Sequence, residues 1–371
     1  MLSQVLETCM LPCQRALFDI PRDVCFMNAA SWSPLPIAVQ EAGRAAVGHK
    51  GQPWKLSSTF QSDQYERARK AAAALIGADP ADVALIPSVG YGVSTAGKVM
   101  PIARGSRVLV LQDDHTSPVL EWMSRADAAG FTVETVKQPT DGDWTSAVLE
   151  AIELPGAAPL ALVSISSVHW SDGGALDMPR IAAAAKARGA ALLVDATHDV
   201  GIRPIDVKAL DPDFLIFPTY KWVLGPYGRA FMYVAKRHQN GVPLEQTAPA
   251  RKAVAAEDTI YFRDLAYAEG ARRYDMGERD HFISMEMAAV GMEMMASWGN
   301  GPIQARLTML TDRLADGLAN TGVRVIDKAL RAESSAPYNS PNTTSSDSGM
   351  TTRSRAAARC WFSNAPPHSR K

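Results

Sequence analysis

The sequence predicts an α/β protein in which seven strands form a mainly parallel sheet with flanking helices. Short apolar runs that suit buried strands alternate with longer stretches of helical periodicity. Such alternation is typical of parallel strands joined by right-handed crossovers. The last two runs are separated by a loop too short for a crossover, so at least one of them is expected to be antiparallel. The expected strands are 83–86, 107–111, 131–136, 160–165, 191–195, 213–217 and 229–234.

Helices are predicted between these strands and at both ends of the chain. Segment 62–80 has Ser62 as its expected N-cap, Gly77 near its end and Pro80 beyond it. A rigid Pro-rich turn leads into an earlier helix at 36–50. Past Gly241 the pattern turns to two long helices rich in Met, whose thioether side chains we expect in the core. The remaining expected helices are 117–130, 144–156, 178–190, 272–299 and 302–322.

The 371 residues suffice for a large core and two domains. We expect a helical N-terminal arm at 1–25 and a large domain at 26–270. Residues 271–330 are expected to form connecting helices and the start of a small domain, with a strand at 322–326. The last segment, 331–371, is crowded with Ser, Thr, Asn and Pro and lacks periodicity, so we expect a disordered tail and an incomplete small domain.

Charge and cysteine content point to a small-molecule ligand in a reducing compartment. The 38 basic and 39 acidic residues nearly cancel, which gives no indication of nucleic acid or an anionic membrane as partner. The N-terminus lacks the pattern of a signal peptide, and no segment reaches the length of a membrane span. Four cysteines do not form a disulfide framework, and no further ligands complete a metal site around Cys9 and Cys13. We therefore expect a cytoplasmic protein without a metal.

Two reactive residues follow neighbouring strands. Asp195 ends the run 191–195, and Lys221 lies just past 213–217, between Tyr220 and Trp222. Ligands gather at the carboxyl ends of strands in open α/β sheets, so the two side chains are expected to share one crevice. A lysine among aromatic residues is partly desolvated, which favours the neutral amine that forms a Schiff base. A carboxylate opposite it would keep a pyridine nitrogen protonated, so the pair indicates pyridoxal 5'-phosphate.

Each residue alone also has an ordinary structural explanation. An aspartate after a strand is often a turn former, and a lysine beside aromatic rings is often a surface residue whose stem packs on them. Their occurrence in this order on successive strands favours the cofactor site.

The stretch resembles the core of the class V aminotransferase family, which are fold type I pyridoxal phosphate enzymes that include cysteine desulfurases and kynureninases. The matching residues are Asp195, His198, Lys221, Gly225 and Pro226. The resemblance implies that Asp195 pairs with the pyridine nitrogen, that His198 lies near the ring hydroxyl and that Lys221 carries the aldimine. It covers about residues 25 to 325 and is specific for cofactor and fold rather than substrate.

Two segments are expected at the cofactor phosphate. The family's phosphate-binding loop corresponds to Val89, Gly90 and Tyr91, ahead of a predicted helix whose N-terminus would suit an anion. Cysteine desulfurases have Ser-Gly-His before the lysine, whereas this chain has Pro-Thr-Tyr at 218–220. That difference is closer to the kynureninase-like branch, in which a tyrosine, here Tyr220, contacts the phosphate.

Three further site residues are expected from the resemblance. His115, with Trp122 seven residues later, matches a desulfurase-like spacing that places the imidazole on the pyridine face. A histidine that caps the following helix is the ordinary alternative. His169 matches a segment that reaches the ring hydroxyl, and Asn28 matches an opening motif on the substrate side of the site.

One position departs from the family pattern. Many relatives have Gly-Thr at 277–278, where the threonine donates to the phosphate of the neighbouring subunit of a symmetric dimer. This chain has Glu278, whose charge would repel a phosphate unless Arg279 takes over. A homodimer with shared sites remains the expectation.

Two classes of function follow from this reading. The first is an enzyme that acts on an amino acid by transamination or Cβ lyase chemistry, with Lys221 also moving the α-proton. Desulfurase activity needs a thiol on a loop of the small domain, and Cys360, in the expected tail, is the nearest candidate. The second is a chain that binds cofactor, or only keeps the fold, without turnover because the small domain is incomplete.

Overall fold

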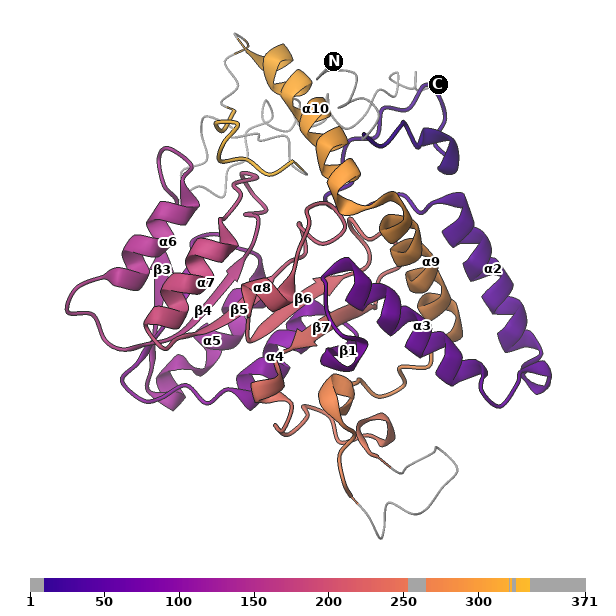
Figure 1. The fold of residues 1–371 in the computed structure, drawn as a ribbon, viewed down its shortest axis with the longest axis horizontal. Coiled ribbons are helices and arrows are strands. Elements are labelled where there is room, and N and C mark those ends of the chain that lie inside the picture. Colours follow the sequence, from indigo (N-terminus) through magenta and orange to yellow (C-terminus); the bar gives the residue numbers. More distant parts are fainter. Residues whose placement is uncertain (1–9, 253–264, 320, 322–324, 334–371) are drawn as a thin grey trace, which may run out of the picture.

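The computed structural model of the chain describes residues 10–252, 265–319, 321 and 325–333. Its centre is one seven-stranded sheet with the strand order β1-β7-β6-β5-β4-β2-β3 (Figure 1). The strands are β1 (Val83–Ile86), β2 (Arg107–Leu111), β3 (Thr132–Val136), β4 (Leu160–Ser166), β5 (Ala191–Asp195), β6 (Phe214–Pro218) and β7 (Ala230–Val234). All seven predicted strands are confirmed, with ends that differ by one residue at most.

The sheet is mixed in the way its short last connection predicts. Strand β7 is antiparallel to both of its neighbours, β1 and β6, whereas β3, β2, β4, β5 and β6 are joined by parallel pairings. Since β1 and β6 both run opposite to β7, six strands point the same way. Their carboxyl ends lie along one edge of the sheet, where ligands are expected.

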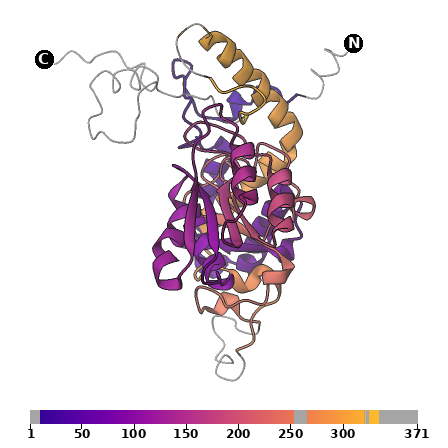
Figure 2. The ribbon, with the colours of Figure 1, turned by 90° about the vertical axis from the view of Figure 1, so that its left-hand side faces the viewer.

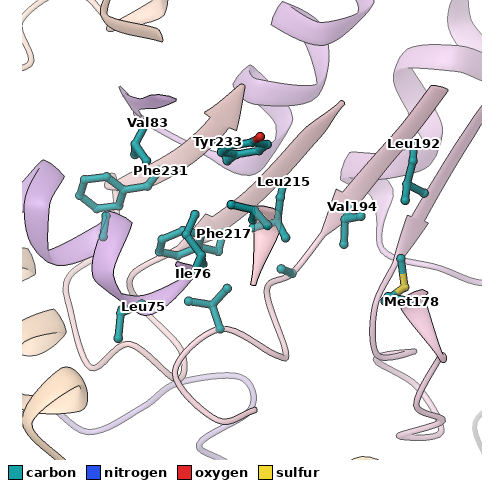
Figure 3. Close-up of a cluster of buried hydrophobic side chains, with 14 of the residues drawn as sticks. Leu75, Ile76, Val83, Met178, Leu192, Val194, Leu215, Phe217, Phe231 and Tyr233 are labelled. Carbon is teal, nitrogen blue, oxygen red and sulfur yellow. The ribbon is translucent and has the colours of Figure 1, made fainter. Parts of the chain in front are cut away.

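Helices cover both faces of the sheet (Figure 1, Figure 2). One face packs on α3 (Phe60–Leu75), α6 (Trp144–Glu153), α7 (Met178–Ala187), α8 (Val207–Leu210) and α9 (Phe282–Trp298). The other face packs on α4 (Val89–Val99) and α5 (Thr116–Ala129). Strand residues alternate between the two cores as a pleated sheet requires: Leu215 and Phe217 lie in the first, Phe214 and Ile216 in the second. Figure 3 shows part of the first core, where Ile76 lies beside Phe217.

The first methionine-rich helix packs in the core as predicted but begins later. In the second helix Met309 is exposed, so the core position expected for that methionine is wrong. Met285, Met292 and Met295 of α9 are buried in the first core. The helix packs against α3 and α2 (Ile37–Gly51) and is followed by α10 (Asn300–Leu318). Residues 270–274 form a short 3₁₀ helix instead of the predicted helix start, and α9 begins after His281, whose ring accepts from Ser284 N.

Three local predictions were wrong or fall outside the described chain. Helix α3 begins at Phe60 after Thr59, so Ser62 is not its N-cap but donates to the Thr59 carbonyl at 2.8 Å. In the arm, residues 10–14 are not helical and 15–17 form one 3₁₀ turn. The strand expected at 322–326 is not seen at residues 325–326, and 322–324 lie outside the described residues.

The expected tail is described only at its start. Residues 334–371 lie outside the described residues, but Arg331 forms a β-bridge with Gly174 and Ala332 is buried. The division into an arm, a large domain, connecting helices and a tail stays a prediction. Among the described helices, none combines the length and the hydropathy needed to cross a membrane.

Candidate active site

A cavity of about 410 Å³ lies at the carboxyl edge of the sheet. It is within the size range of small-ligand sites. Residues that follow four parallel strands line it: Pro87 after β1, His115 after β2, Asp195 at the end of β5 and Pro218 at the end of β6. The other lining residues are Ser88, Val89, Gly90, Ser117, Thr197, Tyr220, Tyr227 and Gly228. The predicted crevice therefore exists where Asp195 was expected.

Asp195 lies buried in the wall of this cavity. Thr197 donates to its Oδ1 twice, from the backbone N at 3.0 Å and from the hydroxyl. None of the described ion pairs involves Asp195, and burial raises the pKa of its carboxyl, with the nearby carboxylate of Asp114 adding to the rise. A buried carboxylate without a cation is costly. A protonated pyridine nitrogen would supply the missing charge, so this residue fits pyridoxal phosphate.

Lys221 is buried next to the cavity rather than in its wall. Its Nζ lies 2.9 Å from His198 Nε2 and 5.7 Å from the centre of the Tyr220 ring, which does line the cavity. Burial lowers the pKa of Lys221, while the charge of Asp195 opposes that fall. Burial and the neighbouring Lys221 also lower the pKa of His198, to about 3. The structure thus brings together the acid, the amine and the histidine that the sequence singled out.

The N-terminus of α4 forms the end of the cavity suited to a phosphate. Ser88 caps the helix by accepting from Tyr91 N at 3.2 Å, and Gly92 N makes the first intrahelical bond to Ser88 O at 3.2 Å. The N–H groups of Val89 and Gly90 precede that bond and are the kind that bind anions. Both residues line the cavity. The side chain of Tyr91 does not line it, since its hydroxyl faces Glu245, which together with burial raises the pKa of that hydroxyl.

Two tyrosines complete this end. Tyr220 and Tyr227 stack with ring centroids 3.9 Å apart, and both line the cavity. Burial raises the pKa of Tyr220 to about 12, so its hydroxyl stays protonated and able to donate at neutral pH. Tyr227, Ser88 and Thr197 were not predicted as site residues. Tyr227 could have been suspected from its place in the Gly-Pro turn, and Thr197 from its position two residues after Asp195.

His115 occupies the helix-cap position without acting as a cap. It is the N-cap residue of α5, but its side chain makes no capping bond, and it lines the cavity instead. The preceding Asp114 fixes this turn, because its carboxylate accepts from His115 N at 2.7 Å and from Ser166 N at 3.0 Å. His115 thus lies at the cavity, and its place on the pyridine face stays a prediction.

His169 and Asn28 are not in the cavity wall. The ring of His169 is buried, stacks on Trp144 at 4.4 Å and bonds the Gln112 carbonyl at 2.9 Å. The carbonyl of Asn28 accepts from Trp32 N at 3.0 Å, and it is the ring of Trp32 that approaches Tyr227, at 5.4 Å. The cofactor and substrate roles of these two residues stay predictions, without a contact to the cavity.

Arg279 is already committed to other groups. Its guanidinium bonds Asp275 at 2.6 Å and lies over the ring of Tyr65 at 3.9 Å. Gly277 N donates to Glu245 at 2.6 Å, and Glu278 adopts a left-handed φ of 52°. Arg279 is therefore not free to take over phosphate binding beside Glu278. At this segment the chain still departs from the family pattern.

The loop that carries Lys221 rests on a glycine of α9. A Cβ built on Gly291 would lie 2.7 Å from the Val223 carbonyl oxygen and 2.9 Å from that of Leu224. Leu224 has a left-handed φ of 57°, so this turn has little freedom to move. We expect Gly291→Ala to push α9 and the turn apart, to lower the free energy of unfolding by about 1–3 kcal/mol and to weaken cofactor retention.

Urea unfolding and equilibrium dialysis of the cofactor would measure these two effects. Gly301→Ala is a matched control, since a Cβ at Gly301 meets nothing within 4 Å. An unchanged free energy of unfolding in Gly291→Ala would show that the turn at Val223 and Leu224 can move away from α9 without cost, which would contradict the prediction.

Comparison with known proteins gives one family. The model of the family described as "Aminotransferase class-V" matches residues 25–358. The chain is 28% identical over 301 residues to an uncharacterised aminotransferase, YcbU, of Bacillus subtilis, covering 81% of this chain and 76% of that protein. It is 26% identical over 322 residues to a kynureninase of Deinococcus radiodurans, covering 82% of this chain and 74% of that protein.

Solved structures share the fold. A cysteine desulfurase from Thermococcus onnurineus, in its apo form, superposes with a TM-score of 0.72 at 21% identity, covering 89% of this chain and 82% of that one. The cystine C–S lyase C-DES superposes with a TM-score of 0.71 at 19% identity, covering 81% of this chain and 80% of that one. At these identities the likeness shows the architecture, and it confirms the predicted fold class.

Proposed function

The chain belongs to the class V aminotransferase family, and from this premise we propose that it converts an amino acid in the cavity bounded by Asp195 and Tyr220, with Lys221 as the reacting amine. It is a pyridoxal phosphate enzyme of class V type. Transamination is the first candidate reaction, and Cβ lyase chemistry is the second. The main support is one observation: a buried amine in contact with His198 lies next to a cavity whose wall holds a buried carboxylate outside the described ion pairs and the N-terminus of a helix.

Each group of the site has a defined task in this proposal. When bound, pyridoxal phosphate supplies an aldehyde that bonds amines and a ring that withdraws electrons from the substrate Cα. Asp195 would hold the proton on the ring nitrogen, and the N–H groups of Val89 and Gly90 with Tyr220 would hold the phosphate. His198 would lie near the ring hydroxyl, and His115 would pack on the ring.

Lys221 has two roles in turn. Its lowered pKa increases the fraction of neutral amine, which is the form that attacks an aldehyde. With a substrate amino acid bound, the freed Nζ would be the general base that accepts the Cα proton. His198, 2.9 Å away, orients Nζ during both steps.

The setting of the enzyme is part of the same proposal. An amino acid is the expected substrate, and a homodimer is the expected assembly. Four cysteines in 371 residues support a reducing, cytoplasmic location.

A spectroscopic experiment tests the function. The purified full chain is loaded with pyridoxal phosphate, reduced with borohydride and digested, and mass spectrometry locates the modified lysine. The loaded protein is then mixed with each amino acid while the visible spectrum is recorded. Loss of the cofactor's aldehyde form with release of a keto acid indicates transamination, whereas release of pyruvate and ammonia from a β-substituted substrate indicates the lyase.

Two results would count against the proposal. A label on a lysine other than Lys221 would remove its chemical centre. Cofactor fixed on Lys221 together with a spectrum that no amino acid changes would favour the alternative, a chain that binds without turnover.

A further inference from the structure

The amine of Lys221 belongs to a chain of three side chains. Trp222 Nε1 lies 3.4 Å from His198 Nδ1, and His198 Nε2 lies 2.9 Å from Lys221 Nζ. Lys221 and His198 are both buried, with 7% of each exposed. Trp222 itself is not part of the cavity wall. The hydrogen bonds of His198 and Lys221 connect the indole to the edge of the cavity.

The hydrogen bonds among these three side chains allow only one position for the proton of a neutral His198. An indole N–H is only a donor, so Nδ1 of His198 must be the acceptor for Trp222. A neutral imidazole has a single proton, which then lies on Nε2. The Nε2–H group faces Nζ of Lys221, and an amine accepts a hydrogen bond only when it is unprotonated. Burial lowers the pKa of both His198 and Lys221, which agrees with two neutral groups.

We propose that Trp222 is a positioning residue that fixes His198 in the Nε2-protonated tautomer, so that His198 holds Lys221 as a neutral, nucleophilic amine. The inference rests on the proposed role of Lys221 and assigns a task to a residue outside the cavity.

The opposite tautomer would have the opposite effect. With the proton on Nδ1, the bare Nε2 would accept from a lysine ammonium and favour the charged form. The other ionisable groups that act electrostatically on this pair are His115 and His169, which lower the pKa of His198, and Asp195, which opposes the fall in the pKa of Lys221. Of these, Asp195 favours the protonated form of Lys221. A proton on His198 Nε2 therefore opposes an electrostatic effect that is already present in the site.

The first test reads the tautomer itself. The full chain, freed of cofactor and labelled with ¹⁵N-histidine, gives long-range ¹H–¹⁵N spectra in which the two ring nitrogens differ by their protonation. The chain has seven histidines, and the His198→Gln variant identifies the signal of His198. We expect protonated Nε2 in the wild type and a mixture in Trp222→Phe, which keeps an aromatic ring but loses the N–H. Protonated Nδ1 in the wild type overturns the proposal, whether or not Trp222→Phe folds.

The second test reads the amine. The rate at which the cofactor-free chain captures pyridoxal phosphate is followed by visible absorbance across pH. Because one hydrogen bond is at stake, we expect Trp222→Phe to capture about 3- to 10-fold more slowly near neutral pH. The rates should converge above pH ~10, where the amine is neutral in any case. Trp54→Phe, which changes a tryptophan that is 77% exposed, is the matched control and should match the wild type.

A double-mutant cycle shows whether Trp222 acts through His198. In the His198→Gln background, Trp222→Phe should leave the capture rate unchanged. The same slowing in that background, or a slowing that is equal at every pH, would assign Trp222 to packing and overturn the proposal. A wild-type chain that captures no cofactor would instead reject the proposed function, while the tautomer spectrum would still stand.

Discussion

Replacing Lys221 with alanine is expected to abolish covalent capture of pyridoxal phosphate and to lower turnover by at least about 10³-fold, the order expected when a general base is removed. The reason is that one amine serves both as the group bonded to the cofactor and as the group that accepts the Cα proton. His198, 2.9 Å from Nζ, is a poor replacement base, because burial and Lys221 lower its pKa to about 3.

Borohydride reduction followed by intact-mass measurement checks the capture, and single-turnover kinetics check the rate. Lys137→Ala is the matched control, since Lys137 is an exposed lysine just after β3. Added methylamine should restore part of the rate in Lys221→Ala by replacing the missing base. A variant that retains covalent cofactor would show that another lysine does this work.

The strands and the central pair were predictable because their signals are local. Runs such as 108–111 and 214–217 are apolar throughout, as strands covered on both faces must be. Asp195 and Lys221 follow two strands that are neighbours in the sheet as well as in the chain, so proximity followed from sequence order. The position of His115 at the cavity was also predictable, because the turn after β2 ends at the same edge, whereas its role there stays a prediction.

What sequence could not show depends on contacts between distant segments. Helix α3 begins at Phe60, earlier than Ser62, where the ring of Phe60 packs edge-on against His49 at 5.0 Å and Phe282 at 5.5 Å. Several serines and threonines near that point were equally good cap candidates, and only tertiary packing selected the start.

The same limit applies to His169. Its residue type and its place after β4 suit a cofactor ligand, but the ring stacks on Trp144, whose indole N–H bonds Asp172 at 2.9 Å. The contact between Trp222 and His198 was likewise invisible, since 24 positions separate these two residues.

Asp195→Asn should have opposite effects on catalysis and on stability. Asparagine keeps the shape and can accept the bonds from Thr197, but it cannot hold a proton on the ring nitrogen. Removing one member of a buried charge pair is severe, so we expect turnover to fall about 10²- to 10³-fold. Stopped-flow measurement of Cα proton exchange in deuterated buffer, with Asp127→Asn at an exposed site as the control, would measure this loss.

The cofactor-free protein should respond in the other direction, and the sign follows from the pKa. Burial raises the pKa of Asp195 in the folded chain, so its contribution to stability is present at low pH and is lost as the pH rises through the folded value. Asparagine does not ionise, so its contribution to stability does not fall as the pH rises. The melting temperature of cofactor-free Asp195→Asn should therefore rise relative to that of the wild type as the pH increases above about 4, the ordinary pKa of an aspartate. Added pyridoxal phosphate should shrink or reverse this gain, because only aspartate gains a partner in the protonated ring. A difference in melting temperature between the cofactor-free variant and the wild type that stays constant with pH would mean that the carboxylate is already compensated in the cofactor-free protein. That result would remove the electrostatic argument for a cationic ring beside it.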